Sequence, residues 1–143
     1  MTYAGNCRIN VWDLDGVFLY SYGSPGGLHR QLLNPQTIKV NSRGEFVISD
    51  LGNNRIKVLD EKGNLLRIFG KTGQGPGDFM RPAGIGIDRY NNIYVTEVKG
   101  NRIQVFDRTG KSITKFGTQG TKKGQFGNLH GCIVDQETGW LYV

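Results

Sequence analysis

The chain has few of the residues on which metal centres, disulfide frameworks and membrane anchors depend. Its 143 residues include two Cys and two His, and no apolar run approaches the 18 residues of a membrane span. Cys7 and Cys132 show no metal-ligand spacing. The N-terminus lacks the basic-then-apolar pattern of a secretory signal. We therefore expect an intracellular, cytoplasmic protein with no membrane contact and no cofactor.

Helical periodicity and proline are also scarce, whereas glycine is abundant. No segment repeats apolar residues at i, i+3 and i+4, and only four Pro are present against 22 Gly. Glycine at about 15% of the chain is roughly twice its usual share. A collagen would need Gly at every third position, and a disordered chain would have far fewer than 37% hydrophobic residues. The glycines therefore separate short ordered segments, which predicts an all-β fold.

A repeat of 47 residues runs through the chain. The segment Arg8–Asp13 recurs as Arg55–Asp60 and as Arg102–Asp107, with the same Arg-Ile-x-Val-x-Asp pattern. Glycines recur at the same interval, as Gly16, Gly63 and Gly110 and as Gly23, Gly70 and Gly117. A period held three times without drift is strong evidence for a repeat architecture. We treat residues 1–143 as one repeat domain with phases 2–48, 49–95 and 96–143.

Each period contains four predicted strands. In the central copy these are Ala83–Asp88, Ile93–Thr96, Arg102–Asp107 and Ser112–Phe116, the last two joined by a tight turn ending at Gly110. Alternation of polar and apolar residues predicts that the third strand is half-buried, with Ile103 and Val105 facing inward. Phased phenylalanines, including Phe116, are expected to pack between repeats. Four strands per 40–50 residues is typical of a β-propeller blade.

The central copy resembles the NHL repeat. The resemblance rests on three segments, Phe79–Asp88, Asn92–Thr96 and Asn101–Asp107, and extends over essentially the whole chain. The last copy departs from the pattern, with Leu129-His130-Gly131 in place of Pro82-Ala83-Gly84 and one inserted residue. The resemblance implies a propeller of mostly six blades, of which three repeats are half. Two interpretations stay open: a fragment of a longer array, or a homodimer in which two chains close a six-bladed ring.

The repeat phase divides the charges between two propeller faces. The face with the loops from strand four to the next strand one, and from strand two to strand three, receives nine cations and three anions. The face with the hairpin turns receives five cations and nine anions. Clustered cations suit phosphate binding. In the TRIM-NHL branch such a basic face binds RNA, so the resemblance implies single-stranded RNA as the ligand; an acidic protein surface, recruited as by a ubiquitin-ligase-like scaffold, is the alternative.

Repetition separates structural cations from ligand candidates. Arg8, Arg55 and Arg102 are in phase, so we expect them to pair with the groups that end strand two, such as Asp50 and Glu97. The out-of-phase cations are the predicted RNA or partner contacts, and two out-of-phase rings on the same face are predicted to stack a base. These candidates are Arg30, Lys71, Arg81, Lys99, Lys122, Lys123, Tyr3 and His29.

Catalysis is not expected. Metal-dependent propeller enzymes need several His, Asp or Glu side chains at the starts of inner strands, and His130 is the only His near such a position. The string Gly73–Gly77 precedes a predicted strand, whereas a phosphate loop precedes a helix. The sequence therefore predicts a binding protein without a catalytic or metal site.

Overall fold

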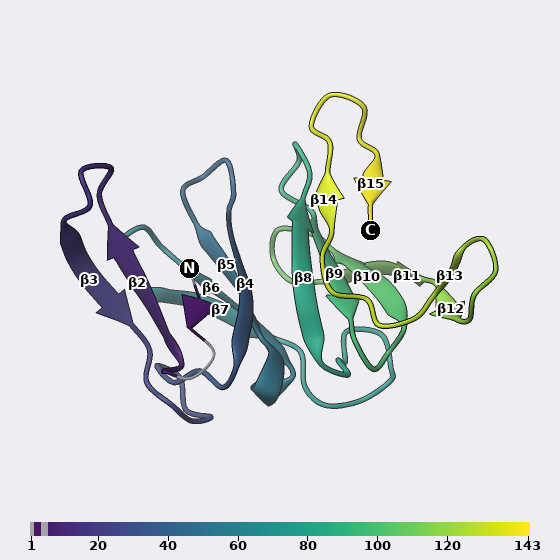
Figure 1. Ribbon diagram of the computed structural model, residues 1–143, viewed down its shortest axis with the longest axis horizontal. Helices are drawn as coiled ribbons and strands as arrows, with labels where there is room; N and C mark the ends of the chain where they lie inside the picture. Colours follow the sequence, from purple (N-terminus) through teal and green to yellow (C-terminus); the bar gives the residue numbers. More distant parts are fainter. Residues whose placement is uncertain (1, 4–5) are drawn as a thin grey trace.

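The strands form a curved row of antiparallel sheets. The computed structural model describes residues 2–3 and 6–143 (Figure 1). Two sheets are complete four-stranded blades. The first consists of β4 (Pro35–Val40), β5 (Phe46–Asp50), β6 (Arg55–Leu59) and β7 (Leu65–Phe69), and the second of β8 (Pro82–Ile87), β9 (Ile93–Glu97), β10 (Arg102–Phe106) and β11 (Ser112–Phe116). The predicted all-β propeller fold is confirmed, with strand bounds shifted by one residue at most.

Partial sheets flank the complete blades. Before them lie β1 (Thr2–Tyr3), β2 (Arg8–Trp12) and β3 (Phe18–Tyr22), and after them the hairpin of β14 (Ile133–Val134) and β15 (Leu141–Tyr142). Two short parallel strands, β12 (Thr118–Gln119) and β13 (Gln125–Phe126), lie in the connection to β14. Within residues 2–3 and 6–143 the one helical segment is the 3-10 turn η1 (Leu51–Asn53), and no helix could cross a membrane.

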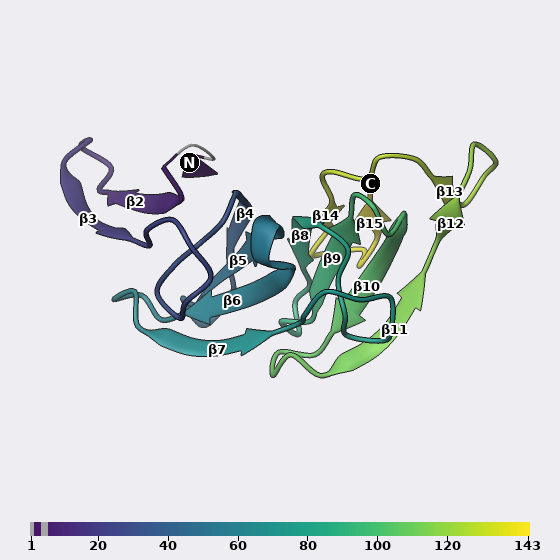
Figure 2. The same ribbon diagram turned by 90° about the horizontal axis from the view of Figure 1, so that it is seen from below.

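The blades are arranged radially. Figure 2 shows the outer strands β3, β7 and β11 along the convex side of the arc, with β4, β8 and β14 toward the concave side. Most hairpin turns point to one edge of the arc, at the top of Figure 1, and the β3–β4 and β7–β8 connections run along the other. We call these the turn face (residues 13–17, 41–45, 60–64, 88–92, 107–111 and 135–140) and the loop face (residues 23–34, 51–54, 70–81, 98–101 and 117–128).

The hydrophobic core lies between blades. One cluster joins Val58 of the first complete blade to Phe79 of the β7–β8 connection and to Ile85 and Phe106 of the second blade, all at most 1% exposed. The Phe106 ring centroid lies 5.0 Å from that of Phe69 and 5.4 Å from that of Phe79. A second cluster packs the N-terminal sheet against the first complete blade. Burial of each large apolar side chain in such a contact between blades stabilises the fold by about 1.5–3 kcal/mol.

This packing corrects two expectations. The third strand is not half-buried: Gln104 is as inaccessible as Ile103, because each blade is covered on both sides. Phe116 is not packed but 45% exposed. Its counterpart Phe69 contacts Phe106, which lies on the third strand of the following blade. The sheet that follows β11 is the two-stranded hairpin β14–β15, which has no third strand to supply a ring that would cover Phe116.

Buried hydroxyl groups connect successive inner strands. The Ser49 hydroxyl of β5 donates a 2.6 Å hydrogen bond to the Ala83 carbonyl of β8, and the Thr96 hydroxyl of β9 donates at 2.9 Å to the His130 carbonyl. The same Thr96 oxygen accepts the Gly84 N–H at 2.8 Å. One hydroxyl per blade therefore fixes the distance between neighbouring blades near the concave side of the arc.

Thr96→Val should destabilise the fold by about 1–3 kcal/mol, because it leaves a buried N–H and a carbonyl without partners while preserving shape. Thr114→Val, on the exposed outer strand β11, is the matched control and should change stability by less than about 0.5 kcal/mol. Urea unfolding followed by tryptophan fluorescence measures both. Equal midpoints for the two variants would contradict the assignment.

Candidate functional site

Two connections of the loop face, residues 23–34 and 70–81, are each organised by a buried carboxylate at the end of strand two. Asp50 and Glu97 are both 0% exposed. Asp50 accepts the Leu33 N–H at 2.7 Å, and Glu97 accepts the Met80 N–H at the same distance. These bonds tie the connection between blades to the second strand of the blade that follows it. A buried charge needs such partners to offset its desolvation.

An arginine completes each carboxylate site. The Nε atoms of Arg55 and Arg102 donate to Asp50 and Glu97 at 2.7 Å. Their remaining guanidinium nitrogens donate to loop carbonyls, those of Gly27, Leu28 and Gln31 for Arg55, and of Gln74 and Asp78 for Arg102. The predicted structural pairing of these two arginines is therefore confirmed. Arg8 is exposed, and its register partner in β1 is Tyr3 in place of an acid.

A second buried side chain holds the same loop from strand three. Lys57 is 0% exposed and its Nζ donates to the carbonyls of His29, at 2.7 Å, and Gln31. Gln104, one repeat later, donates to the equivalent Asp78 carbonyl at 2.6 Å. Burial, with the nearby charge of Arg55, lowers the pKa of Lys57 to about 8. The backbone that carries His29 and Arg30 is thus positioned from below by Lys57.

The out-of-phase cations remain at the surface. All six predicted cations are exposed, as is His29. None of the four ion pairs found within the described part of the chain includes any of the six. The side chain of Tyr3 lies outside the described residues. The loop face therefore combines satisfied structural arginines with accessible, unpaired cations.

Two adjoining hollows on this face form a polar groove beside the second complete blade. Their volumes are about 370 and 460 Å³, and they share Met80, Lys99, Asn101 and Gln119. We call them together the loop-face groove. Its remaining lining is Gln74, Val98, Gly100, Arg102, Lys115, Gly127 and Asn128.

The groove includes some predicted residues and leaves others apart. Lys99 lines it, and Arg81 lies beside it, since the Val98 N–H donates to the Arg81 carbonyl at 3.0 Å. Lys122 and Lys123 lie in the turn between β12 and β13 and line neither hollow. Lys71, Arg30 and His29 belong to other parts of the loop face.

Sequence reasoning missed Lys115. Its place within β11 put it among strand residues, outside both faces, yet it lines the groove together with Lys99. It is out of phase, since Ile68 and Ser21 occupy its position in the other copies. That mismatch is the signal that could have identified it.

Acids of the turn face have a structural explanation. The Asp60 carboxylate accepts hydrogen bonds from Asn64 and from the Lys62 N–H, which hold its pKa below the ordinary value. Thr109 acts in the same way on Asp107, and the Thr138 N–H on Asp135. These carboxylates close turns. The basic excess of the loop face has no equivalent structural cause.

The comparisons with known proteins agree with this architecture. A model of the DUF5128 family, described as a 6-bladed beta-propeller, matches residues 30–103, just over half of the chain. The chain belongs to this family. No curated protein matches the sequence.

Solved structures resemble the propeller at low identity. Virginiamycin B lyase from Staphylococcus aureus has 20% identity and a TM-score of 0.65 over 97% of this chain and 48% of its own. A streptogramin B lyase has 16% identity and a TM-score of 0.68 with the same coverage. Hydrazine synthase of Kuenenia stuttgartiensis has 14% identity and a TM-score of 0.58 over 82% and 31%. The chain spans about half the length of the two lyases, and these likenesses concern the fold alone.

Arg81→Asn should stabilise the propeller by roughly 0.5–1 kcal/mol. Arg81 has a φ of 61°, and the equivalent residues Asn34 and Asn128 have 49° and 56°. Asn tolerates this left-handed conformation at lower cost than Arg. Chemical unfolding measures the gain. Arg108→Asn, on an exposed turn, is the control, and a gain of the same size in both variants would contradict the explanation by backbone strain.

The stability contributed at Lys57 should rise with pH between about 8 and 9.5. The folded chain releases this proton near pH 8, whereas an unfolded lysine keeps it to about 10.5. The unfolded chain therefore binds more protons in this window, and the free energy of unfolding increases with pH. Lys57→Gln, which copies Gln104, should remove this slope.

The informative quantity is the difference between wild type and Lys57→Gln. Burial raises the pKa of Cys132 to about 11, so its titration has the opposite sign and cancels in the difference. Urea titrations at pH 7.5, 8.5 and 9.5 suffice. A difference that is independent of pH would show that Lys57 titrates as an ordinary lysine.

Proposed function

We propose that this propeller segment is a non-enzymatic binding module whose loop face binds single-stranded RNA. The observation that carries the proposal is the separation of cations into two kinds. Arg55 and Arg102 form ion pairs with Asp50 and Glu97 and donate hydrogen bonds to loop carbonyls. The six predicted cations of the loop face are exposed and outside every ion pair of the described residues, so no ion pair within the blades accounts for them.

The loop-face groove has the chemistry of a nucleic-acid contact. Lys99 and Lys115 supply charge for phosphate groups, and the amides of Gln74, Asn101 and Gln119 supply donors and acceptors for base edges. Exposed His29 offers a ring for stacking on a neighbouring loop. The resemblance to NHL repeats, some of which bind RNA through this face, supports the same ligand.

A non-enzymatic role is supported by the distribution of reactive side chains. Among the described residues, no three His, Cys, Asp or Glu side chains gather as metal ligands would. Asp50 and Glu97, the carboxylates that organise two loops of this face, are buried and already paired. The lyases named among the similar structures share the fold at 20% identity or less.

One observation favours the alternative, an acidic protein partner recruited by a ubiquitin-ligase-like scaffold. None of the described residues that line the loop-face groove is aromatic. RNA-binding surfaces use such rings for stacking, whereas a carboxylate-rich peptide needs only cations and amides. The experiment below therefore includes an acidic peptide.

Replacing Lys99 and Lys115 together by Gln should weaken binding to a random single-stranded RNA pool by about tenfold or more at low salt. The dependence of log Kd on log salt should become shallower by about 1.4, because two phosphate contacts are lost at about 0.7 each. Fluorescence anisotropy over a salt series measures both quantities.

The matched control replaces Arg108 and Lys111 of the turn face by Gln, with the same change in net charge. Equal losses in the two double variants would indicate nonspecific attraction and contradict a loop-face site. If the RNA pool shows no binding but a poly-glutamate peptide binds in a Lys99- and Lys115-dependent manner, the scaffold alternative replaces the RNA proposal.

A further inference from the structure

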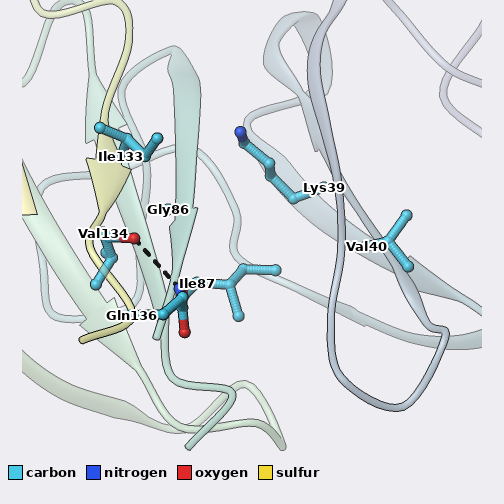
Figure 3. A pocket seen from close by; sticks show the side chains of 7 residues that line it. All are labelled: Lys39, Val40, Gly86, Ile87, Ile133, Val134 and Gln136. Carbon is cyan, nitrogen blue, oxygen red and sulfur yellow. Dashed lines mark hydrogen bonds between the residues drawn. The ribbon is translucent and has the colours of Figure 1, made fainter. Parts of the chain in front are cut away.

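A chemically different hollow lies on the concave side of the arc. It has a volume of about 270 Å³ and is bounded by the inner strands β4, β8 and β14 of three successive blades (Figure 3). Its walls are formed mainly by Val40, Ile87, Ile133 and Val134. Three blades therefore contribute to one apolar enclosure that is separate from the loop-face groove.

Lys39 is the one charged residue in this lining. Figure 3 shows its side chain extending from β4 toward the side on which Gly86 and Ile133 lie. Lys39 is partly buried, and neither a hydrogen bond nor an ion pair engages it within the described residues. A lysine ammonium beside an apolar wall lacks the counter-charge that would stabilise it.

The repeat shows that the blade does not require this lysine. Gly86 and Ile133 occupy the same repeat position in the next two blades. The absence of a side chain at Gly86 lets β8 lie close to the next blade: a Cβ there would lie 3.0 Å from Val134 Cγ2 and 3.4 Å from the Cys132 sulfur. Lys39 is thus the charged residue at a repeat position that is occupied by Gly86 and Ile133 in the next two blades, and its side chain extends toward them.

The second polar side chain of the lining is already engaged. The Gln136 amide donates at 2.6 Å to the Ile87 carbonyl and at 3.2 Å to the Val134 carbonyl, as the dashed line to Val134 in Figure 3 shows. Cys132, behind the wall, is protonated because burial raises its pKa to about 11. The free capacity of the site is one cationic donor at an apolar surface.

We propose that this enclosure binds a small organic anion with a hydrocarbon body, a short-chain carboxylate, whose carboxylate pairs with Lys39. The chain of the ligand lies against Ile87, Ile133 and Val134, and the charge at one end sets its orientation. A charge-assisted hydrogen bond in a partly enclosed site supplies specificity for the anion over the corresponding alcohol.

Hexanoate is the probe, and 1-hexanol is its uncharged match. Titration of the 15N-labelled chain should shift the amide resonances of Gly86, Ile133 and Val134, with hexanoate binding at least about tenfold tighter than hexanol. Lys39→Met should remove this preference, whereas Lys39→Arg should keep it. Lys115→Met, with its lysine on the outer strand, is the control for net charge and should bind hexanoate as wild type does.

The proposal fails if hexanoate and hexanol bind equally to the wild type, or if Lys39→Met and Lys115→Met lose the same affinity. It also fails if the shifts map to the loop face. A thermal unfolding transition like that of the wild type confirms that each variant is folded. Lys39→Gln repeats the test should the Met variant be unfolded. The Lys99→Gln/Lys115→Gln variant should still bind hexanoate, so the outcome is independent of the RNA experiment.

Discussion

A buried carboxylate at the end of strand two is the constraint on which the loop face depends. Asp50 and Glu97 are fully removed from solvent, so each must be matched by charge and by hydrogen bonds. Arg55 and Arg102 provide the charge. Hydrogen bonds come from backbone N–H groups of the connections and from the side-chain amides of Asn53 and Gln104. Because the N–H groups belong to the connection that enters the blade, satisfying one carboxylate also fixes the loop that joins the blades.

The functional surface follows from that arrangement. Once the loop backbone is held from below by an arginine and by Lys57 or Gln104, the residues at its crest are free to vary. The cations Arg81 and Lys99 lie on this face, and within residues 2–3 and 6–143 neither takes part in an ion pair. The turn face differs in kind, because acids such as Asp60 are part of its turns. The two faces therefore differ in charge for two reasons: the acids of the turn face take part in its turns, and the cations of the loop face are accessible to a ligand.

Much of this could be predicted because the repeat reports on geometry. The 47-residue period indicated four-stranded blades, the roles of Arg55 and Arg102, and which loops share a face. It did not indicate that Gln104 is buried, because alternation within one strand says nothing about a neighbouring blade that covers the other side. Nor did it predict the exposure of Phe116, which depends on whether a following third strand is present to cover it.

The sequence by itself determined the blade, its period and the split between phased and unphased cations, since these follow from local pattern and turn chemistry. Only the tertiary structure decided which unphased residues meet. Lys115 joins Lys99 in the loop-face groove, and Lys39 faces the apolar strands of two later blades. The physical reason is that the radial packing of blades brings together residues that are far apart in the chain. The positions of residues within one repeat do not indicate which residues of different blades will be neighbours.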